Sequence, residues 1–405
     1  MRNHLFSYTL LALMAAAVLV SSGCGGSSSS SPGNNNIANS GQNVAAVTVD
    51  PGPAGDYVNG VFTNVTVCAP GSTTNCQTIS GVLVDTGSVG LRVLSSALAV
   101  PLTQQTDSNA SPIAECNQFQ DGYTWGPVKT ADIQIAGESV SSIPVQVIGD
   151  PAFSAVPTAC TDTGLTAEDT LQALGANGIL GVGVFLQDCG PACTANDSSN
   201  PGIYFACPAT GCQITAEGTA QQVQNPVGLF PTDNNGVVLE LPTVPSGGAA
   251  STTGSLVFGI GTQSNNTLGS AKVFALDSNG FISTVFANQV YQSFLDSGSN
   301  GLYFLDSSTT GIPVCNDNSS FYCPSSNQNL TVQNQSVNGN SGNATITVGN
   351  ADTLFANSSA FAYNNLAGPN PSTFDFGLPF FFGRNVFTAI EQRNTPGGTG
   401  PYFAY

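Results

Sequence analysis

The chain consists largely of short apolar runs that polar and turn-forming residues interrupt. From about residue 44 onward, Val, Ile, Phe and Tyr gather in runs of a few residues, and Gly, Pro, Asn and Ser separate them; examples are 82–84, 145–148 and 344–348. Such runs predict strands. Helical periodicity is hard to find, with Thr166–Leu174 as one short candidate. The pattern therefore predicts a mainly β protein.

The length of the chain predicts two lobes. The part beyond the amino-terminal segment has about 360 residues, which is more than one hydrophobic core usually serves. We place an N-terminal β lobe at residues 46–265 and a C-terminal β lobe at residues 266–405.

The first 45 residues are typical of an exported protein. A short basic start precedes an unbroken apolar run, Leu10–Val20, which is too short to span a bilayer but suits an export signal. The small residues before Cys24 resemble a bacterial lipoprotein cleavage site. We expect a signal peptide at 1–23, then a lipidated Cys24 and a disordered Gly/Ser/Asn tether at 24–45. The body would then be anchored to the cell envelope, in the outer membrane, facing the periplasm or the cell surface. An ordinary signal cut nearby is the alternative.

Cysteine parity agrees with export. The chain has 11 cysteines, and a lipidated Cys24 leaves an even set, which is typical of disulfides in an oxidising compartment. Cys68 with Cys76 and Cys315 with Cys323 are the expected local pairs. Metal binding is the less favoured interpretation, because other close cysteines lie in Gly/Pro/Asn-rich loops and no histidine accompanies them.

The scarcity of cations and histidine excludes several kinds of chemistry. The chain has 6 Lys+Arg against 24 Asp+Glu, and its single histidine, His4, lies in the predicted signal peptide. Without imidazole, a Ser-His-Asp or Cys-His nucleophile system and a histidine-based zinc site are excluded. A few scattered cations cannot neutralise a phosphate backbone, which excludes nucleic-acid binding. An enzyme of this composition is expected to use carboxylates, with no metal and no organic cofactor.

A weak internal repeat singles out two of the carboxylates. Residues 85–94 and 296–305 are identical at six of ten positions, and each segment begins with an aspartate, Asp85 or Asp296, that follows an apolar strand. A second element recurs in the same order, because residues 179–186 match residues 375–382 in apolar pattern and in one glycine. Each half therefore carries an aspartate turn and, much later, an apolar strand that ends in glycine.

These features resemble the pepsin-like, two-lobed aspartic proteases. The strand-Asp-Thr/Ser-Gly-Ser turns carry the resemblance, together with Gly254–Gly259 and Phe376–Glu391, which resemble the ends of the two lobes. As a bacterial exported lipoprotein member, the chain would have two β lobes related by a pseudo-twofold axis with a cleft between them. The resemblance implies that Asp85 and Asp296 are catalytic. In this family two adjacent carboxyls share a proton, so one acts as base on a water while the other polarises the peptide carbonyl.

The resemblance also gives roles to the neighbours of the aspartates. Thr86 and Ser297 would hydrogen-bond across the pseudo-twofold axis, and Ser88 and Ser299 would stand beside the aspartates. The supporting residues of the two turns are then Thr86, Gly87, Ser88, Ser297, Gly298 and Ser299. A third copy of the motif, at 162–164, has no apolar strand before it and is predicted to be a loop.

The chain departs from the family pattern where substrate is gripped. Phe119 occupies the position of the usual flap tyrosine, and Arg92 stands where a supporting tryptophan is usual. Tyr123 or the single tryptophan, Trp125, would replace the flap ring, or both would pack the hairpin. Asp375 replaces an expected apolar residue before the glycine of the second repeat element.

Three functions compete at this point. The leading hypothesis is a monomeric aspartic endopeptidase that acts on peptides or unfolded proteins and meets the membrane only through its lipid anchor. The alternative is a catalytically inactive pepsin-fold protein that binds peptide or glycan at the envelope. A glycosidase with two carboxylates also needs no histidine, but nothing in the sequence beyond spare carboxylates favours it.

Overall fold

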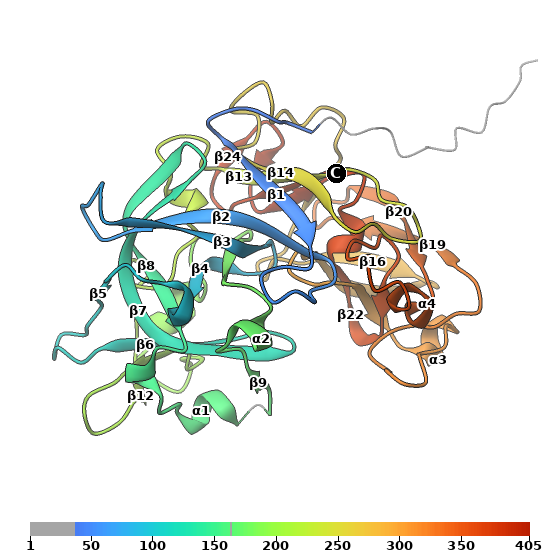
Figure 1. Ribbon diagram of the computed structural model, residues 1–405. Coiled ribbons are helices and arrows are strands. Elements are labelled where there is room, and N and C mark those ends of the chain that lie inside the picture. The colour runs from blue at the N-terminus through green and yellow to red at the C-terminus, as the bar shows by residue number, and fades with distance from the viewer. Residues whose placement is uncertain (1–36, 163) are drawn as a thin grey trace, which may run out of the picture.

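The protein has two β-rich lobes (Figure 1). The computed structural model describes residues 37–162 and 164–405, so the predicted signal peptide, Cys24 and most of the predicted tether lie outside the described residues. Blue to green strands of the first lobe occupy one side of Figure 1, and orange to red strands of the second occupy the other. The described α-helices are short, of about one turn each: α1 (Thr158–Thr161), α2 (Leu171–Leu174), α3 (Ser307–Thr310) and α4 (Ala351–Phe355). The mainly β prediction is confirmed.

The first lobe is built around a buried strand that delivers Asp85. Its strands are β2 (Gly60–Cys68), β3 (Cys76–Asp85), β4 (Val89–Leu94), β5 (Thr103–Gln104), β6 (Ile113–Gln118), β7 (Gly122–Ile135), β8 (Glu138–Ile148), β9 (Thr166–Ala167), β10 (Gly178–Val182), β11 (Tyr204–Ala206) and β12 (Gln213–Ile214). Strand β10 lies between β3, to which it is parallel, and β4, to which it is antiparallel. Val82, Leu83 and Val84 are all buried because β3 is covered on both faces.

The second lobe repeats this arrangement around Asp296. Its strands are β16 (Ile282–Phe286), β17 (Gln289–Leu295), β18 (Leu302–Leu305), β19 (Gln328–Gln335), β20 (Ser341–Val348), β21 (Ala367–Gly368) and β22 (Asn370–Phe376). Strand β22 lies between β17, to which it is parallel, and β18, to which it is antiparallel. Leu295 is paired with Phe376 at the end of β17, so the chain enters the second aspartate turn as it enters the first.

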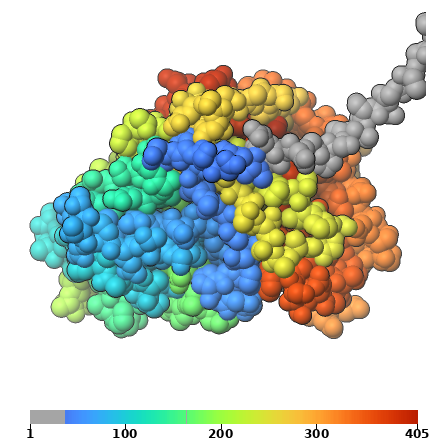
Figure 2. Space-filling view, turned by 45° about the horizontal axis from the view of Figure 1, so that its top comes forward, coloured from blue at the N-terminus to red at the C-terminus, as the bar shows by residue number. Residues whose placement is uncertain are grey.

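A sheet shared by both lobes joins them. Its antiparallel pairings give the order β1 (Val44–Asp50), β14 (Thr252–Phe258), β13 (Gly236–Leu241), β23 (Arg384–Ala389), β26 (Tyr402–Ala404) and β15 (Val273–Ala275). The β13–β23 pair lies at its middle, with one strand from each half of the chain. Figure 2 shows the blue β1 segment lying across the surface beside yellow residues of the chain's middle. A hairpin, β24 (Asn394–Thr395) and β25 (Gly398–Thr399), forms a separate two-stranded sheet.

Two sequence predictions need correction. The end of the predicted tether at 24–45 is ordered against the shared sheet: β1 begins at Val44, and the Ala38 N–H donates to Glu240 Oε2 at 2.6 Å. Backbone pairing with β14 holds Val44 and Ala45, and the Asn43 side-chain amide donates to the Phe258 carbonyl at 2.9 Å. The helix predicted for Thr166–Leu174 is only the turn α2, which the Thr170 hydroxyl caps and Gly175 ends in a left-handed conformation (φ 71°).

Five disulfides link the ten cysteines of the body. Both local pairs named from the sequence, Cys68–Cys76 and Cys315–Cys323, are present. The others are Cys116–Cys160, Cys189–Cys193 and Cys207–Cys212. Disulfides form and persist in oxidising compartments, so they indicate a protein that is exported from the cytoplasm. Within residues 37–162 and 164–405, no helix is long and apolar enough to cross a bilayer.

Candidate active site

The first aspartate turn points the Asp85 carboxyl at the opposite lobe. Asp85 is the last residue of β3, and its Oδ1 accepts a hydrogen bond from the Gly87 N–H at 2.7 Å, while its Oδ2 accepts one from the Ser88 hydroxyl. A Cβ at Gly87 would lie 2.6 Å from Cγ of Asp296. Only glycine therefore lets the second carboxyl approach this turn.

The second turn has the same geometry. The Asp296 N–H donates to the Phe376 carbonyl at 3.1 Å, which fixes the residue at the end of β17. Its Oδ1 accepts from the Gly298 N–H at 2.8 Å and its Oδ2 from the Ser299 hydroxyl at 2.9 Å. A Cβ at Gly298 would lie 2.7 Å from Cγ of Asp85. Each carboxyl thus lies over the glycine of the other turn.

The two carboxyls form one unit. Asp85 is 6% exposed and Asp296 is half-buried, and each carboxyl lies against the glycine of the other turn. Burial, followed by the proximity of Asp85 and of Asp375, raises the pKa of Asp296 well above its ordinary value. Asp296 therefore keeps its proton at a pH at which solvated carboxyls are ionised.

A symmetric set of hydrogen bonds holds the turns together. The Thr86 N–H donates to Ser297 Oγ at 3.1 Å, and the Ser297 N–H donates to Thr86 Oγ1 at 2.9 Å. Each hydroxyl then donates to the strand of the other lobe, Thr86 to the Leu295 carbonyl at 3.0 Å and Ser297 to the Val84 carbonyl at 2.8 Å. The sequence named this pair of residues, and the structure brings them together across the lobes.

A third carboxyl adjoins the pair. Asp375, on β22, has its Oδ2 2.7 Å from Ser299 Oγ, the hydroxyl that also contacts Asp296. Burial raises the pKa of Asp375 to about 8; the Ser299 hydrogen bond opposes this rise and the Asp85 carboxyl adds to it. The sequence marked Asp375 as a departure from the family pattern but did not place it at the site.

The flap residues of the sequence prediction pack the hairpin formed by β6 and β7. Tyr123 and Trp125 are buried with the Cys116–Cys160 disulfide, and the Trp125 indole donates to the Phe153 carbonyl at 2.7 Å. This is the hairpin-packing alternative. The Phe119 N–H closes the hairpin on the Gly122 carbonyl at 2.8 Å, and the Phe119 ring packs against a cluster that also contacts Tyr57.

Two ionisable groups beside the flap hairpin were missed from the sequence. Tyr57 lies in the loop before β2, and burial, followed by Asp121, Glu168 and Asp85, raises the pKa of its phenol. Burial, with a contribution from Asp121, raises the pKa of Glu168 to about 7. Nothing in the local sequence of either residue signals this position, because long-range folding places both of them near the flap hairpin.

Arg92 anchors a buried ionic cluster on the strand that follows the first turn. Its Nη2 lies 2.5 Å from Glu115 Oε1 and 3.0 Å from Asp188 Oδ2, and its Nη1 donates to the Val89 carbonyl at 2.6 Å. The Tyr204 hydroxyl donates to Asp188 at 2.7 Å. Glu115 belongs to β6, so the cluster connects the flap hairpin with the strand next to Asp85. It occupies the place that the family resemblance gives to a tryptophan.

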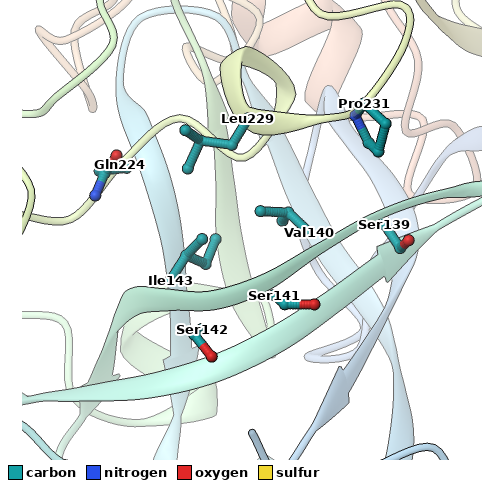
Figure 3. Close-up of a pocket in the computed structure, with 8 residues that line it drawn as sticks. All are labelled: Ser139, Val140, Ser141, Ser142, Ile143, Gln224, Leu229 and Pro231. Carbon is teal, nitrogen blue, oxygen red and sulfur yellow. The ribbon is translucent and has the colours of Figure 1, made fainter. Parts of the chain in front are cut away.

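Other parts of the described chain offer no better site. The group of potential metal ligands found there, Cys315, Cys323 and Asp352, includes both sulfurs of a disulfide, which are not available as thiolates. Figure 3 shows a pocket between β8 and the segment around Leu229. Its lining has no charged side chain and includes neither Asp85 nor Asp296. The lining residues are Ser139, Val140, Ser141, Ser142, Ile143, Gln224, Leu229 and Pro231.

Comparison with solved structures defines the class of fold. The aspartic proteinase from Irpex lacteus is similar to this chain, with a TM-score of 0.50 and 16% sequence identity over 89% of this chain and 96% of that one. At this identity the likeness establishes the fold, so the predicted bilobed pepsin-like fold is confirmed. The chain belongs to the family described as "Protein of unknown function (DUF3443)", whose model matches residues 39–405. No curated protein gave a significant match.

Proposed function

We propose that the protein is an aspartic endopeptidase that hydrolyses peptide bonds with a water activated between Asp85 and Asp296. The observation that carries this proposal is the crossed geometry of the turns, in which each carboxyl lies over the glycine of the other lobe. The N–H groups of Gly87 and Gly298 donate to Oδ1 of Asp85 and of Asp296, which fixes the orientation of both carboxyls. Such preorganised support is what acid–base catalysis by a carboxyl pair requires.

The raised pKa of Asp296 supports the division of labour within the pair. The ionised member takes a proton from the water as the water attacks the peptide carbonyl, and the protonated member donates a hydrogen bond to the carbonyl oxygen. The proton belongs to the pair, so the step needs no fixed assignment of acid and base. The substrate class that fits is a peptide or an unfolded protein chain.

Incubation of purified residues 37–405 with an unfolded protein, from acid to neutral pH, tests this proposal. Asp85→Asn and Asp296→Asn are matched variants that preserve side-chain shape, and each is expected to lower cleavage by about 10³-fold or more, because the pair acts as a unit. A peptide transition-state analogue should inhibit the wild-type protein. Cleavage that survives either substitution would overturn the assignment.

A binding protein without catalysis is the second candidate. It is favoured by the burial of Tyr123 and Trp125, which leaves the flap without either ring to close on a substrate. A folded, disulfide-bonded wild-type protein that cleaves nothing at any pH, yet binds peptide in calorimetry, would support this candidate over the enzyme.

We also propose that Cys24 is lipidated after removal of residues 1–23, which anchors the exported body to the bacterial outer membrane. The even set of cysteines that remains without Cys24, and the five disulfides that these form, support export. Incorporation of labelled palmitate into the full chain, lost in Cys24→Ala, tests the anchor. Equal labelling of the variant would contradict it.

A further inference from the structure

The Ser299 hydroxyl lies between two carboxyl oxygens. Its Oγ is 2.9 Å from Asp296 Oδ2 and 2.7 Å from Asp375 Oδ2, which are both hydrogen-bond distances. A serine hydroxyl has one hydrogen and can donate it to one acceptor only. Each of these two contacts needs a hydrogen, so when Ser299 donates to Asp296, the hydrogen of the other contact must come from Asp375.

Asp375 is placed where its neutral form is favoured. It is 7% exposed, and its Oδ1 accepts no hydrogen bond from the described residues. Its charged neighbours, Asp85 and Asp296, are carboxyls, and Tyr303 faces it from β18 as its cross-strand partner. No cation is among these groups, so an ionised Asp375 would be a buried and poorly solvated charge. Its raised pKa agrees with this.

The first lobe lacks this arrangement at the matching position. Asp375 is paired with Phe294, two residues before Asp296, and Ile179 is paired with Leu83, two residues before Asp85. The Ser88 hydroxyl contacts Asp85 Oδ2, and Ile179 is an apolar core residue. An isoleucine therefore fits this position of the fold, and the acid in the second lobe is a specific addition to it.

We propose that Asp375 is a positioning residue for the catalytic pair: its protonated carboxyl donates to Ser299 Oγ and thereby turns the Ser299 hydroxyl toward Asp296. Loss of the Asp375 proton reverses the hydrogen bond between Asp375 and Ser299. Ser299 then donates to the Asp375 carboxylate, and Asp296 loses this donor. Three neighbouring carboxyls thus hold two protons in the active state. This inference rests on the proposed peptidase function and adds an alkaline switch to it.

Two substitutions at one position separate the roles of Asp375. Asp375→Asn keeps a hydrogen-bond donor toward Ser299 but cannot ionise, and Asp375→Ile copies the residue at the matching position of the first lobe. The measurements are kcat and kcat/KM for a peptide substrate between pH 3 and 9, with thermal unfolding as the control for folding.

The alkaline limb of the pH profile should move upward in both variants, by about one pH unit, because one of the titrating protons is removed. At the acidic optimum, Asp375→Asn should retain about fivefold more activity than Asp375→Ile, since only the amide orients Ser299. An alkaline limb unchanged from wild type in the folded Asp375→Asn variant would overturn the inference.

Carboxyl titration keeps this test separate from that of the proposed function. Carbon-13 NMR of labelled aspartates should show, in wild type, a carboxyl that titrates near pH 8 and disappears in Asp375→Asn, together with a shifted titration of Asp296. If the wild-type protein cleaves nothing while these titrations are present, the peptidase proposal fails, but the proposed role of Asp375 in orienting Ser299 is supported. If the protein cleaves but Asp296 titrates identically in the variant, the proposed role of Asp375 is wrong and the peptidase proposal is unaffected.

Discussion

The two aspartate turns are alike at their tips and differ in what lies behind them. Gly87 and Gly298, and Thr86 and Ser297, make matching contacts with the opposite turn. Seven residues after each aspartate the likeness ends: the first lobe has Arg92, with two buried acidic partners, and the second has Tyr303, whose hydroxyl donates to Asn300 at 2.5 Å.

The residues paired with Arg92 and Tyr303 on the neighbouring strands differ too: the one in the first lobe is apolar and the one in the second is acidic. Arg92 is paired with Ile179 on β10, and Tyr303 is paired with Asp375 on β22. In the first lobe the buried Arg92 cation is therefore paired with two carboxylates. In the second lobe the Asp375 carboxyl shares the Ser299 hydroxyl with Asp296 and has no cation among its named neighbours. The two turns therefore share one geometry, but the groups behind them differ in role. The Arg92 cluster supports the structure of the first lobe, and Asp375 controls protonation in the second.

Replacement of the Arg92 guanidinium should show the largest difference between the lobes. Arg92→Met leaves Glu115 and Asp188 as buried carboxyls without their cation, which should lower the free energy of unfolding by about 3–5 kcal/mol at pH 7. The matched change, Tyr303→Phe, removes one hydrogen bond and should cost about 1 kcal/mol. Urea unfolding of both variants measures the difference.

A charge-neutralising control sharpens that test. Burial, with the proximity of Glu115, already raises the pKa of Asp188. Adding Glu115→Gln and Asp188→Asn to Arg92→Met removes the unpaired charges, so part of the lost stability should return. Equal losses from Arg92→Met and Tyr303→Phe would show that the ionic cluster gives the first lobe no special support.

Substitution of the turn glycines should affect both lobes alike. A Cβ at Gly87 or at Gly298 would collide with the carboxyl of the opposite aspartate, at 2.6 Å and 2.7 Å from its Cγ. Gly87→Ala and Gly298→Ala should each lower kcat by about 100-fold, because an ångström-scale displacement of a catalytic group has this cost. Full activity of one variant would show that the two turns do not approach each other equally.

Most of the fold could be predicted from the sequence, and so could the tips of the two turns. The alternation of short apolar runs gave the strand content, and the repeat around Asp85 and Asp296 gave the two-lobed arrangement, because both signals are local in the chain. The reciprocal hydrogen bonds between Thr86 and Ser297 followed from the family resemblance, since they depend on the same short motif.

The surroundings of the site could not be predicted because they depend on contacts between distant segments. Tyr57 and Glu168 reach the flap from loops without a motif. Arg92 and Asp375 were visible as departures from the family pattern, but their partners were not. Only the folded structure shows that Arg92 contacts Glu115 and Asp188, and that Asp375 contacts Ser299. The burial of Trp125 likewise depends on the distant Phe153 and Phe205.

Removal of the crossed hydroxyls should weaken both turns to a similar, smaller extent. Thr86→Ala and Ser297→Ala each remove two buried hydrogen bonds, so each should lower the free energy of unfolding by about 2 kcal/mol. The double variant should cost less than the sum, because the hydroxyls serve one network. Thr86→Ser, which keeps the hydroxyl, is the control. A strongly unequal effect would show that one lobe depends on the other more than the symmetric contacts indicate.

The smallest expected effect is a change in the pH dependence of stability that Asp375 adds in the second lobe. Asp375 has a pKa of about 8 in the folded protein and an ordinary value near 4 when unfolded, so the folded state binds more protons between these values. Stability from this group is therefore present at low pH and is lost as pH rises toward 8. Asp375→Asn should remove this loss, which amounts to at most about 1.4 kcal/mol per pH unit. Urea unfolding at pH 6 and 7 measures the change, and Ile179→Val, a conservative change at the matching position of the first lobe, should leave the wild-type slope in place. Identical slopes in wild type and Asp375→Asn would mean that the third carboxyl is not the titrating group that distinguishes the lobes.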